Sequence, residues 1–210
     1  ISLRDMGIEV RFAPGDKCDD IEPLIDGRTK AVYLENLGNP AFNVPDYEPI
    51  IEMAHRRGIC VMVDNTFGCG GYLFRPIEWG ANVVIHSATK WICGHGTSLG
   101  GVVVDGGNFE WSEEKYPLLA APAESYHGLV YKEVFGNAAF AGRVRVDGLR
   151  NFGPSASPFN SFLMLQGLET LSLRAQRCCD NTLALAQWLE GHEAIESVNY
   201  PGLKSNPYHT

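Results

Sequence analysis

The chain has 210 residues, and its 17 basic against 25 acidic side chains give a formal net charge of -8. This balance argues against a nucleic-acid-binding surface and against a polybasic membrane patch, since both need clustered Lys and Arg. A content of 45% hydrophobic residues excludes general disorder. No apolar run reaches the length of a transmembrane helix.

The cysteines and the first residues indicate the setting of the protein. None of the six cysteines forms a CxxC pair, which argues against a zinc ribbon or a thioredoxin motif. An acidic chain without a recognisable signal peptide predicts a cytoplasmic protein with reduced thiols. Because the chain does not start with Met and opens within what resembles a structural element, we expect it to be part of a larger protein.

Strand-like and helix-like segments alternate over the first 105 residues. Runs of apolar and β-branched residues predict strands at 7–12, 29–35, 59–64, 81–86 and 101–105. Helices are predicted at 19–25 and 45–58. The last three strands are continuous rather than alternating apolar runs, which is typical of strands buried on both faces. The pattern therefore predicts an α/β fold with a mostly parallel central sheet flanked by helices.

The sequence changes character after residue 106. Residues 107–128 are rich in Pro, Gly, Trp and Tyr and predict a long ordered loop, and residues 132–150 predict a helix. Residues 160–191 have the apolar spacing of one or two long helices, with a bend expected at Gly167. A further strand is predicted at 197–200, where a second domain would begin.

Polar side chains follow two neighbouring strands of the predicted sheet. Asp64 ends one strand, and Ser87, Thr89 and Lys90 follow the next. Because parallel strands meet with their carboxyl ends at one edge of the sheet, we expect these residues to lie close together. An amine that forms a Schiff base, a carboxylate that pairs with a pyridine nitrogen and hydroxyls that bind phosphate together fit pyridoxal phosphate (PLP). Asn39, after the 29–35 strand, is a candidate for the ring hydroxyl or a substrate carboxylate.

Each of these residues also has an ordinary structural explanation. A Lys after a strand is usually a solvated charge, and a strand-end Asp or Ser usually caps a turn. Only the order and spacing of the set favour the cofactor. Gly96–Gly100 matches the GxSxG motif of serine hydrolases with Ser98 as nucleophile, but that motif needs a strand before the Ser and a helix after it. The histidines show neither HxxxH nor HExxH spacing, so we expect no metal site.

The motifs around these residues carry a family likeness. Val63-Asp-Asn-Thr-Phe67 and His86-Ser-Ala-Thr-Lys-Trp91 resemble the Cys/Met-metabolism family of fold-type-I PLP-dependent enzymes. Within it, the O-acetylhomoserine sulfhydrylase branch is the most similar, on the segments 92–105, 108–111, 126–129, 157–160 and 165–171. The resemblance covers essentially the whole chain.

The resemblance implies a role for each candidate residue. It implies that Lys90 holds PLP as a Schiff base and shuttles protons, and that Asp64 pairs with the pyridine nitrogen. It implies that Ser87 and Thr89 bind the phosphate. It also implies that Asn39 contacts the ring oxygen and the substrate, and that Ser157 lies near the substrate carboxylate. It also implies a division of the chain into 1–155, a PLP-binding large domain incomplete at its N-terminus; 156–192, connecting long helices; and 193–210, the truncated start of a smaller C-terminal α/β domain.

The implied reaction is γ-replacement on O-acetylhomoserine by sulfide or methanethiol, which gives homocysteine or methionine and acetate. Within the family, the competing activities are those of cystathionine γ-synthase, cystathionine γ-lyase and methionine γ-lyase. The resemblance further implies small-molecule substrates, no nucleic-acid or membrane partner, and a homotetramer built of dimers that share active sites. Two hypotheses outside this set stay open on the residues alone, namely a hydrolase that uses Ser98 and an inactive piece of an enzyme.

Overall fold

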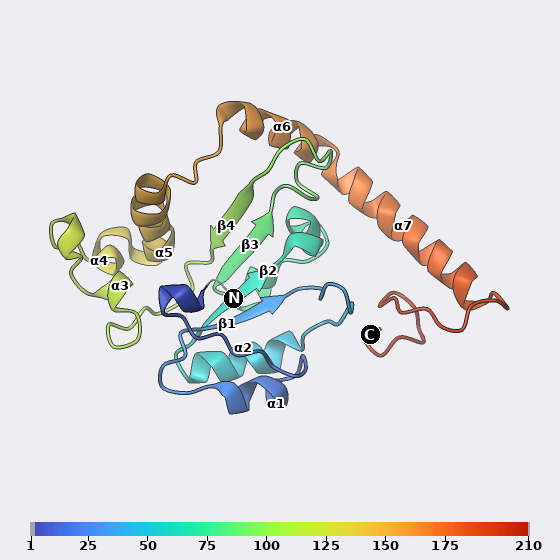
Figure 1. Cartoon of the computed structure of the whole chain (residues 1–210), viewed down its shortest axis with the longest axis horizontal. Helices are drawn as coiled ribbons and strands as arrows, with labels where there is room; N and C mark the ends of the chain where they lie inside the picture. Colours follow the sequence, from blue (N-terminus) through green and yellow to red (C-terminus); the bar gives the residue numbers. More distant parts are fainter. Residues whose placement is uncertain (1–2, 210) are drawn as a thin grey trace.

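The computed structural model describes residues 3–209, with a sheet of four strands at its centre (Figure 1). The strands are β1 (Ala31–Glu35), β2 (Cys60–Asp64), β3 (Val83–Ser87) and β4 (Gly101–Asp105), adjacent in that order. β1, β2 and β3 run parallel, and β4 runs antiparallel to β3. The predicted mostly parallel α/β sheet flanked by helices is confirmed.

Helices and single turns connect the strands and continue beyond them. The α-helices are α1 (Cys18–Ile21), α2 (Tyr47–Arg56), α3 (Pro117–Ala120), α4 (Tyr131–Phe135), α5 (Ala139–Arg143), α6 (Pro158–Glu169) and α7 (Leu171–Glu190). The 3-10 turns are η1 (Arg4–Met6), η2 (Glu22–Leu24), η3 (Thr66–Gly71), η4 (Pro76–Trp79), η5 (Glu124–Tyr126) and η6 (Gly136–Ala138), and η7 (Val144–Phe152) is a π-helix. Within residues 3–209, no helix has the length and apolar character needed to cross a membrane.

The two faces of the sheet are covered by different parts of the chain. Alternate side chains of a strand point to opposite faces. Val61 and Val63 of β2 therefore pack in one apolar cluster with α2, whereas Cys60 packs in a second cluster with side chains from residues 109–140. Both clusters are fully buried at their centres. The strands that carry the candidate residues are thus fixed from both sides.

β4 differs from the prediction in its surroundings. A continuous apolar run predicted burial on both faces, but Val102, Val103 and Val104 are 39–49% exposed. β4 is the edge strand of the described sheet, so only β3 pairs with it. An apolar run indicates a strand but carries no signal for its direction or its place in the order, which is why the antiparallel pairing was not predicted.

The strand predicted at 7–12 is wrong, because this segment is irregular in the structure. Its alternating apolar residues find no sheet to pack on, and Phe12 is 88% exposed. The segment is held instead by Arg11, which donates to the backbone oxygen of Leu24 at 2.7 Å and pairs with Asp26 at 2.7 Å. A strand needs a neighbour for its backbone groups, and side-chain contacts take that place here.

The strand predicted at 197–200 is also wrong, since no strand is formed there in the described part of the chain. The segment contacts the rest of the protein through a side chain, because Asn199 donates to the backbone oxygen of Ala41 at 3.0 Å. Asn206 donates in turn to the side-chain oxygen of Asn199 at 3.0 Å. Side-chain bonds of this kind fasten the segment without a strand ladder.

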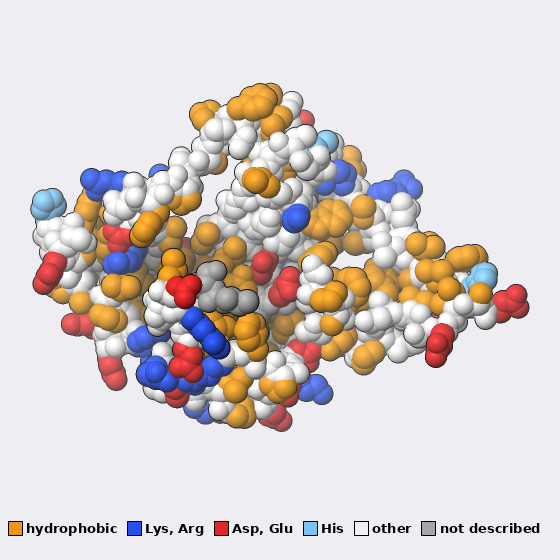
Figure 2. All heavy atoms as spheres, in the orientation of Figure 1, with side chains coloured by type: hydrophobic (Ala, Val, Ile, Leu, Met, Phe, Trp, Pro, Cys, Tyr) orange, Lys and Arg blue, Asp and Glu red, His pale blue; other side chains and the backbone are white. Residues whose placement is uncertain are grey.

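The long helices of the C-terminal half are confirmed, but the predicted bend is misplaced. α6 ends and α7 begins at Thr170, whose backbone leaves the helical region at φ -109° and ψ 4°. α6 exposes Phe159, Phe162 and Leu165, and apolar side chains gather over it in Figure 2.

The segment before α6 differs in part from the prediction. The predicted loop at 107–128 contains α3 and η5, and the helix predicted at 132–150 is interrupted by changes of helix type.

Tyr116 fastens the amino ends of β1 and β2. Its hydroxyl accepts a hydrogen bond from the backbone N–H of Cys60 at 2.9 Å and lies 2.8 Å from the backbone oxygen of Lys30. Burial raises the pKa of Tyr116 to about 12, so the hydroxyl keeps the proton that it donates. One side chain thus satisfies backbone groups on two strands where the ladder ends.

We expect Tyr116→Phe to lower the free energy of unfolding by about 1–3 kcal/mol, because the buried N–H of Cys60 loses its acceptor. Denaturant unfolding of the full-length protein measures the change. Tyr126→Phe is the matched control, since the Tyr126 hydroxyl makes no hydrogen bond among residues 3–209. Equal losses for both variants would contradict this role of Tyr116.

Candidate active site

The carboxyl ends of β2 and β3 bring the candidate residues together. In the parallel ladder Asp64 lies opposite Ile85, and the N–H of Asn65 donates to the backbone oxygen of Ile85 at 2.7 Å. Asp64 therefore lies beside the strand end that Ser87 completes and Lys90 follows. The juxtaposition predicted from the sequence is present in the structure.

The carboxylate of Asp64 is held in one orientation by Thr66. Its Oδ1 accepts the Thr66 N–H at 2.9 Å and the Thr66 hydroxyl at 2.6 Å. The same hydroxyl accepts the N–H of Ser87 at 2.9 Å, which ties β2 to β3. Because both bonds to Asp64 fall on Oδ1, the lone pairs of Oδ2 keep acceptor capacity. Thr66 was not among the predicted site residues, although its place two positions after a strand-end Asp is typical of a local side-chain turn.

The neighbours of Asp64 respond to its charge. Burial and then the Asp64 carboxylate raise the pKa of Tyr33 on β1. His86 on β3 is 7% exposed, and burial lowers its pKa while the charge of Asp64 acts in the opposite direction. Among the described residues its Nδ1 has no hydrogen-bond partner. His86 is thus a buried residue that packs at this strand end, where burial disfavours its charged form.

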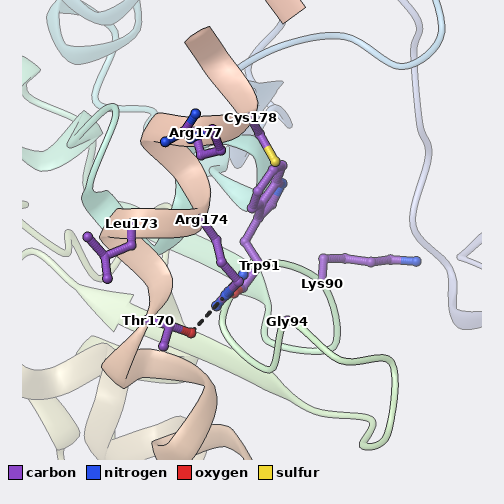
Figure 3. A pocket seen from close by; sticks show the side chains of 8 residues that line it. All are labelled: Lys90, Trp91, Gly94, Thr170, Leu173, Arg174, Arg177 and Cys178. Carbon is purple, nitrogen blue, oxygen red and sulfur yellow. Dashed lines mark hydrogen bonds between the residues drawn. The ribbon is translucent and has the colours of Figure 1, made fainter. Parts of the chain in front are cut away.

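Lys90 lies in the turn that follows β3. Its N–H donates to the backbone oxygen of Ser87 at 3.2 Å, and its own oxygen accepts the N–H of Gly94 at 2.8 Å. The side chain is exposed, forms no ion pair within residues 3–209, and points away from α7 (Figure 3). The backbone is thus fixed while the amine is left accessible.

The two candidate hydroxyls differ in their surroundings. The Thr89 hydroxyl accepts the N–H of Gly100 at 3.1 Å and lies 3.3 Å from the oxygen of the same residue. It therefore closes the loop between β3 and β4. The Ser87 hydroxyl makes no hydrogen bond in the described part of the chain and is half-buried. Phosphate binding by Ser87 and Thr89 stays a prediction.

Asn39 and Ser157 lie at other places in the fold. Asn39 follows β1 and is exposed, and its N–H donates to Glu35 Oε2 at 3.2 Å. Ser157 caps α6, because its hydroxyl accepts the N–H of Asn160 at 3.1 Å. No hydrogen bond joins either residue to Asp64 or Lys90 in the described structure. Their roles toward a substrate stay predictions.

The hydrolase hypothesis fails on the geometry around Ser98. Ser98 is 5% exposed and lies in a loop that leads directly into β4. Within residues 3–209, no strand precedes it closely and no helix follows it directly, so the strand–Ser–helix turn of a nucleophile elbow is absent.

A model of the family described as Cys/Met metabolism PLP-dependent enzyme matches residues 1–210. The chain belongs to this family. Homocysteine/cysteine synthase of Saccharomyces cerevisiae is 54% identical over all of this chain and 48% of its own length. O-acetyl-L-homoserine sulfhydrylase 1 of Thermus thermophilus is 49% identical over all of this chain and 50% of its own length. The chain thus spans about half the length of these Cys/Met-metabolism relatives.

Solved structures of Cys/Met-metabolism enzymes agree with the fold. A crystal structure from Campylobacter jejuni, named as an O-acetylhomoserine (thiol)-lyase and containing N'-pyridoxyl-lysine-5'-monophosphate, superposes with a TM-score of 0.93. It is 36% identical, and the match covers 99% of this chain and 51% of that one. The O-acetylhomoserine sulfhydrylase of Wolinella succinogenes is also 36% identical, with a TM-score of 0.83 over 99% of this chain and 55% of that one. The fold-type-I resemblance is confirmed.

The residues present fit the PLP of this family. Lys90 offers an amine that forms no ion pair in the described structure, Asp64 keeps acceptor capacity on Oδ2, and Ser87 has a hydroxyl without a partner there. These are the three groups that PLP requires: an amine, a carboxylate and a hydrogen-bond donor for phosphate.

We expect Thr66→Val to lower the affinity of the full-length protein for PLP by about tenfold, since charge-assisted hydrogen bonds contribute about 1.5–3 kcal/mol. The variant removes a donor to Asp64 and the acceptor of the Ser87 N–H. Fluorescence titration of the cofactor-free protein with PLP measures the affinity. Thr66→Ser keeps the hydroxyl and should restore most of the binding. A wild-type affinity in Thr66→Val would show that Thr66 does not orient Asp64 for the cofactor.

Proposed function

We propose that the full-length protein is a PLP-dependent transferase that replaces the acetate of O-acetylhomoserine with sulfide or methanethiol. The observation that carries the proposal is Lys90, which is accessible in the turn after β3 and near Asp64, in a chain that matches the family throughout. In this reaction the Cγ–O bond breaks, acetate leaves, and a Cγ–S bond forms, which gives homocysteine or methionine.

The chain's own residues would hold the cofactor and move protons. PLP, when bound, supplies an electron sink for the charge that develops on the substrate carbons. The Asp64 carboxylate would keep a proton on the pyridine nitrogen, and Thr66 would orient it for this task. Lys90 Nζ would attach the cofactor and move protons at Cα and Cβ of the substrate. Ser87 and Thr89 would bind the phosphate, and Asn39 and Ser157 would bind the substrate.

The names of the relatives support γ-replacement over γ-elimination. The Thermus and Wolinella proteins are both named for O-acetylhomoserine sulfhydrylase activity, and the yeast relative for homocysteine and cysteine synthesis. Identities of 49–54% over the whole chain favour the same reaction here.

The assembly and location form part of the same proposal. We place the enzyme in the cytoplasm as a homotetramer built of dimers that share active sites, and we retain the division into 1–155, 156–192 and 193–210. The exposed apolar side chains of α6 form a surface that further chain or a second copy would cover.

The small-molecule partners of the enzyme are the amino-acid ester and sulfide or a thiol.

We expect Lys90→Ala to abolish the γ-replacement reaction and the attachment of PLP. In the wild-type full-length protein, bound PLP gives a visible absorption band, and borohydride links it to the peptide that contains Lys90, as mass spectrometry would detect. Lys17→Ala, an exposed Lys beside α1, should leave the band and the label unchanged. A Lys90→Ala variant that retains γ-replacement would overturn the assignment.

The products separate this reaction from those of the other family members. With O-acetylhomoserine and sulfide, we expect homocysteine and acetate in equal amounts, quantified by mass spectrometry. Omission of sulfide should stop homocysteine formation, because no other sulfur donor is present. Release of 2-oxobutanoate as the main product, with or without sulfide, would identify a γ-lyase and reject the proposed function.

A further inference from the structure

Arg174 of α7 makes a contact that the proposed function does not use. Its guanidinium donates to the backbone oxygen of Trp91 at 2.9 Å, and to that of Gly167 near the end of α6 at 2.8 Å. Its Nε also donates to the Thr170 hydroxyl at 3.1 Å (Figure 3). Trp91 is the residue directly after Lys90. One side chain therefore joins the turn of residues 88–94, here called the Lys90 turn, to both long helices.

Two glycines allow the turn and the helices to meet without an intervening side chain. A Cβ on Gly94, which has φ +74°, would lie 2.5 Å from the guanidinium carbon of Arg174. A Cβ on Gly167 would lie 2.2 Å from the backbone oxygen of Cys93 and 2.3 Å from that of Ile92. Because Cβ atoms do not tolerate such distances, Arg174 and α6 reach the backbone of the turn only through these glycines.

A small apolar cluster surrounds the contact. Ile92 of the turn packs with Leu171 and Ala175, which lie one helical turn apart on α7 and flank Arg174. Ala88 and Cys69 complete the cluster from the segments after β3 and β2. The bonds from the guanidinium to the Trp91 and Gly167 carbonyl groups are part-buried beside this cluster, and the charge of the donor strengthens them.

The Lys90 amine does not contact Arg174, although both residues line one pocket. Arg174 lines a pocket of about 690 Å³ between the turn and α7, and Lys90, Trp91 and Gly94 of the turn also line it. The Lys90 side chain points away from α7 (Figure 3). The hydrogen bonds of Arg174 therefore reach the turn through the backbone oxygen of Trp91, the residue after Lys90, and not through the Lys90 amine.

We propose that Arg174 is a positioning residue that fixes the backbone of the Lys90 turn on α7 and so holds the Lys90 amine in place. The docking of the turn depends only on the contacts above. Its effect on turnover rests on the proposed function, in which Lys90 carries the cofactor.

The turn contains two amides that report directly on its docking. The N–H of Cys93 donates to the oxygen of Ala88 at 2.8 Å, and the N–H of Gly94 donates to the oxygen of Lys90 at 2.8 Å. In the cofactor-free full-length protein, we expect Arg174→Gln to speed hydrogen exchange of these two amides by about tenfold. This factor corresponds to the loss of about one net hydrogen bond to a charged group. The amides of Val61 and Val63 in β2 provide the reference for global stability.

Two further measurements and two further variants distinguish positioning from a general structural role. We expect Arg174→Gln to lower kcat by about tenfold to a hundredfold through misplacement of the amine, with little change in KM. The pH titration of the visible band should also shift, because the amine changes its surroundings. Arg174→Lys keeps the charge but not the planar set of N–H donors, so its kcat and its titration should lie between those of the wild type and Arg174→Gln. Arg177→Gln is the matched control, since Arg177 lies on the same helix, is exposed and makes no hydrogen bond within residues 3–209.

The outcomes separate this proposal from the proposed function. Wild-type exchange of Cys93 and Gly94 in Arg174→Gln overturns the positioning role, as does an equal rise in exchange across β2. If Arg174→Gln does not fold, Arg174→Lys decides by the same comparison of turn and β2 amides. Faster exchange confined to the turn, in a protein whose wild type never attaches PLP to Lys90, supports the docking and rejects the proposed function instead.

Discussion

The parallel pairing of β2 with β3 is the constraint on which the candidate site depends. Parallel strands end at the same edge, so the pairing brings Asp64 next to the segment that carries Lys90 although 26 positions separate them in sequence. The Thr66 hydroxyl strengthens this join, because it bonds the Asp64 carboxylate on one strand and the Ser87 backbone on the other. The apolar clusters on both faces hold the pair of strands against their neighbours. The chemistry proposed for Lys90 requires that these two strand ends do not move apart.

Much of this arrangement is encoded in local patterns. The apolar runs at 59–64 and 81–86 are long enough to indicate buried strands, and the polar residues after them follow from the rule that parallel sheets bind ligands at their carboxyl ends. The prediction fails where a strand depends on a partner rather than on its own composition. Residues 7–12 alternate correctly but have no strand beside them, and β4 pairs antiparallel to β3 although its own composition gives no signal of direction.

The site shows the same division between local and distant signals. Lys90 and Asp64 are predicted because motif order and strand ends coincide. Thr66 is close to Asp64 in sequence, so a local side-chain turn at the strand end is a signal that could have indicated it. Arg174 carries no comparable signal, since it meets Trp91 across 83 positions and through a backbone oxygen that any residue would supply. Gly94 and Gly167 are informative only once the close approach of the helices is seen.

The length of α7 gives the docking of the Lys90 turn a mechanical meaning. A helix of 20 residues is about 30 Å long, and Arg174 lies within its first turn. Most of α7 therefore extends past the fastened end and away from the sheet (Figure 1). Were the helix to tilt about this contact, its far end would move through a wider arc than the end beside Trp91. A contact in the first turn of α7 would therefore keep the Lys90 turn next to the pivot, where such a tilt displaces atoms least.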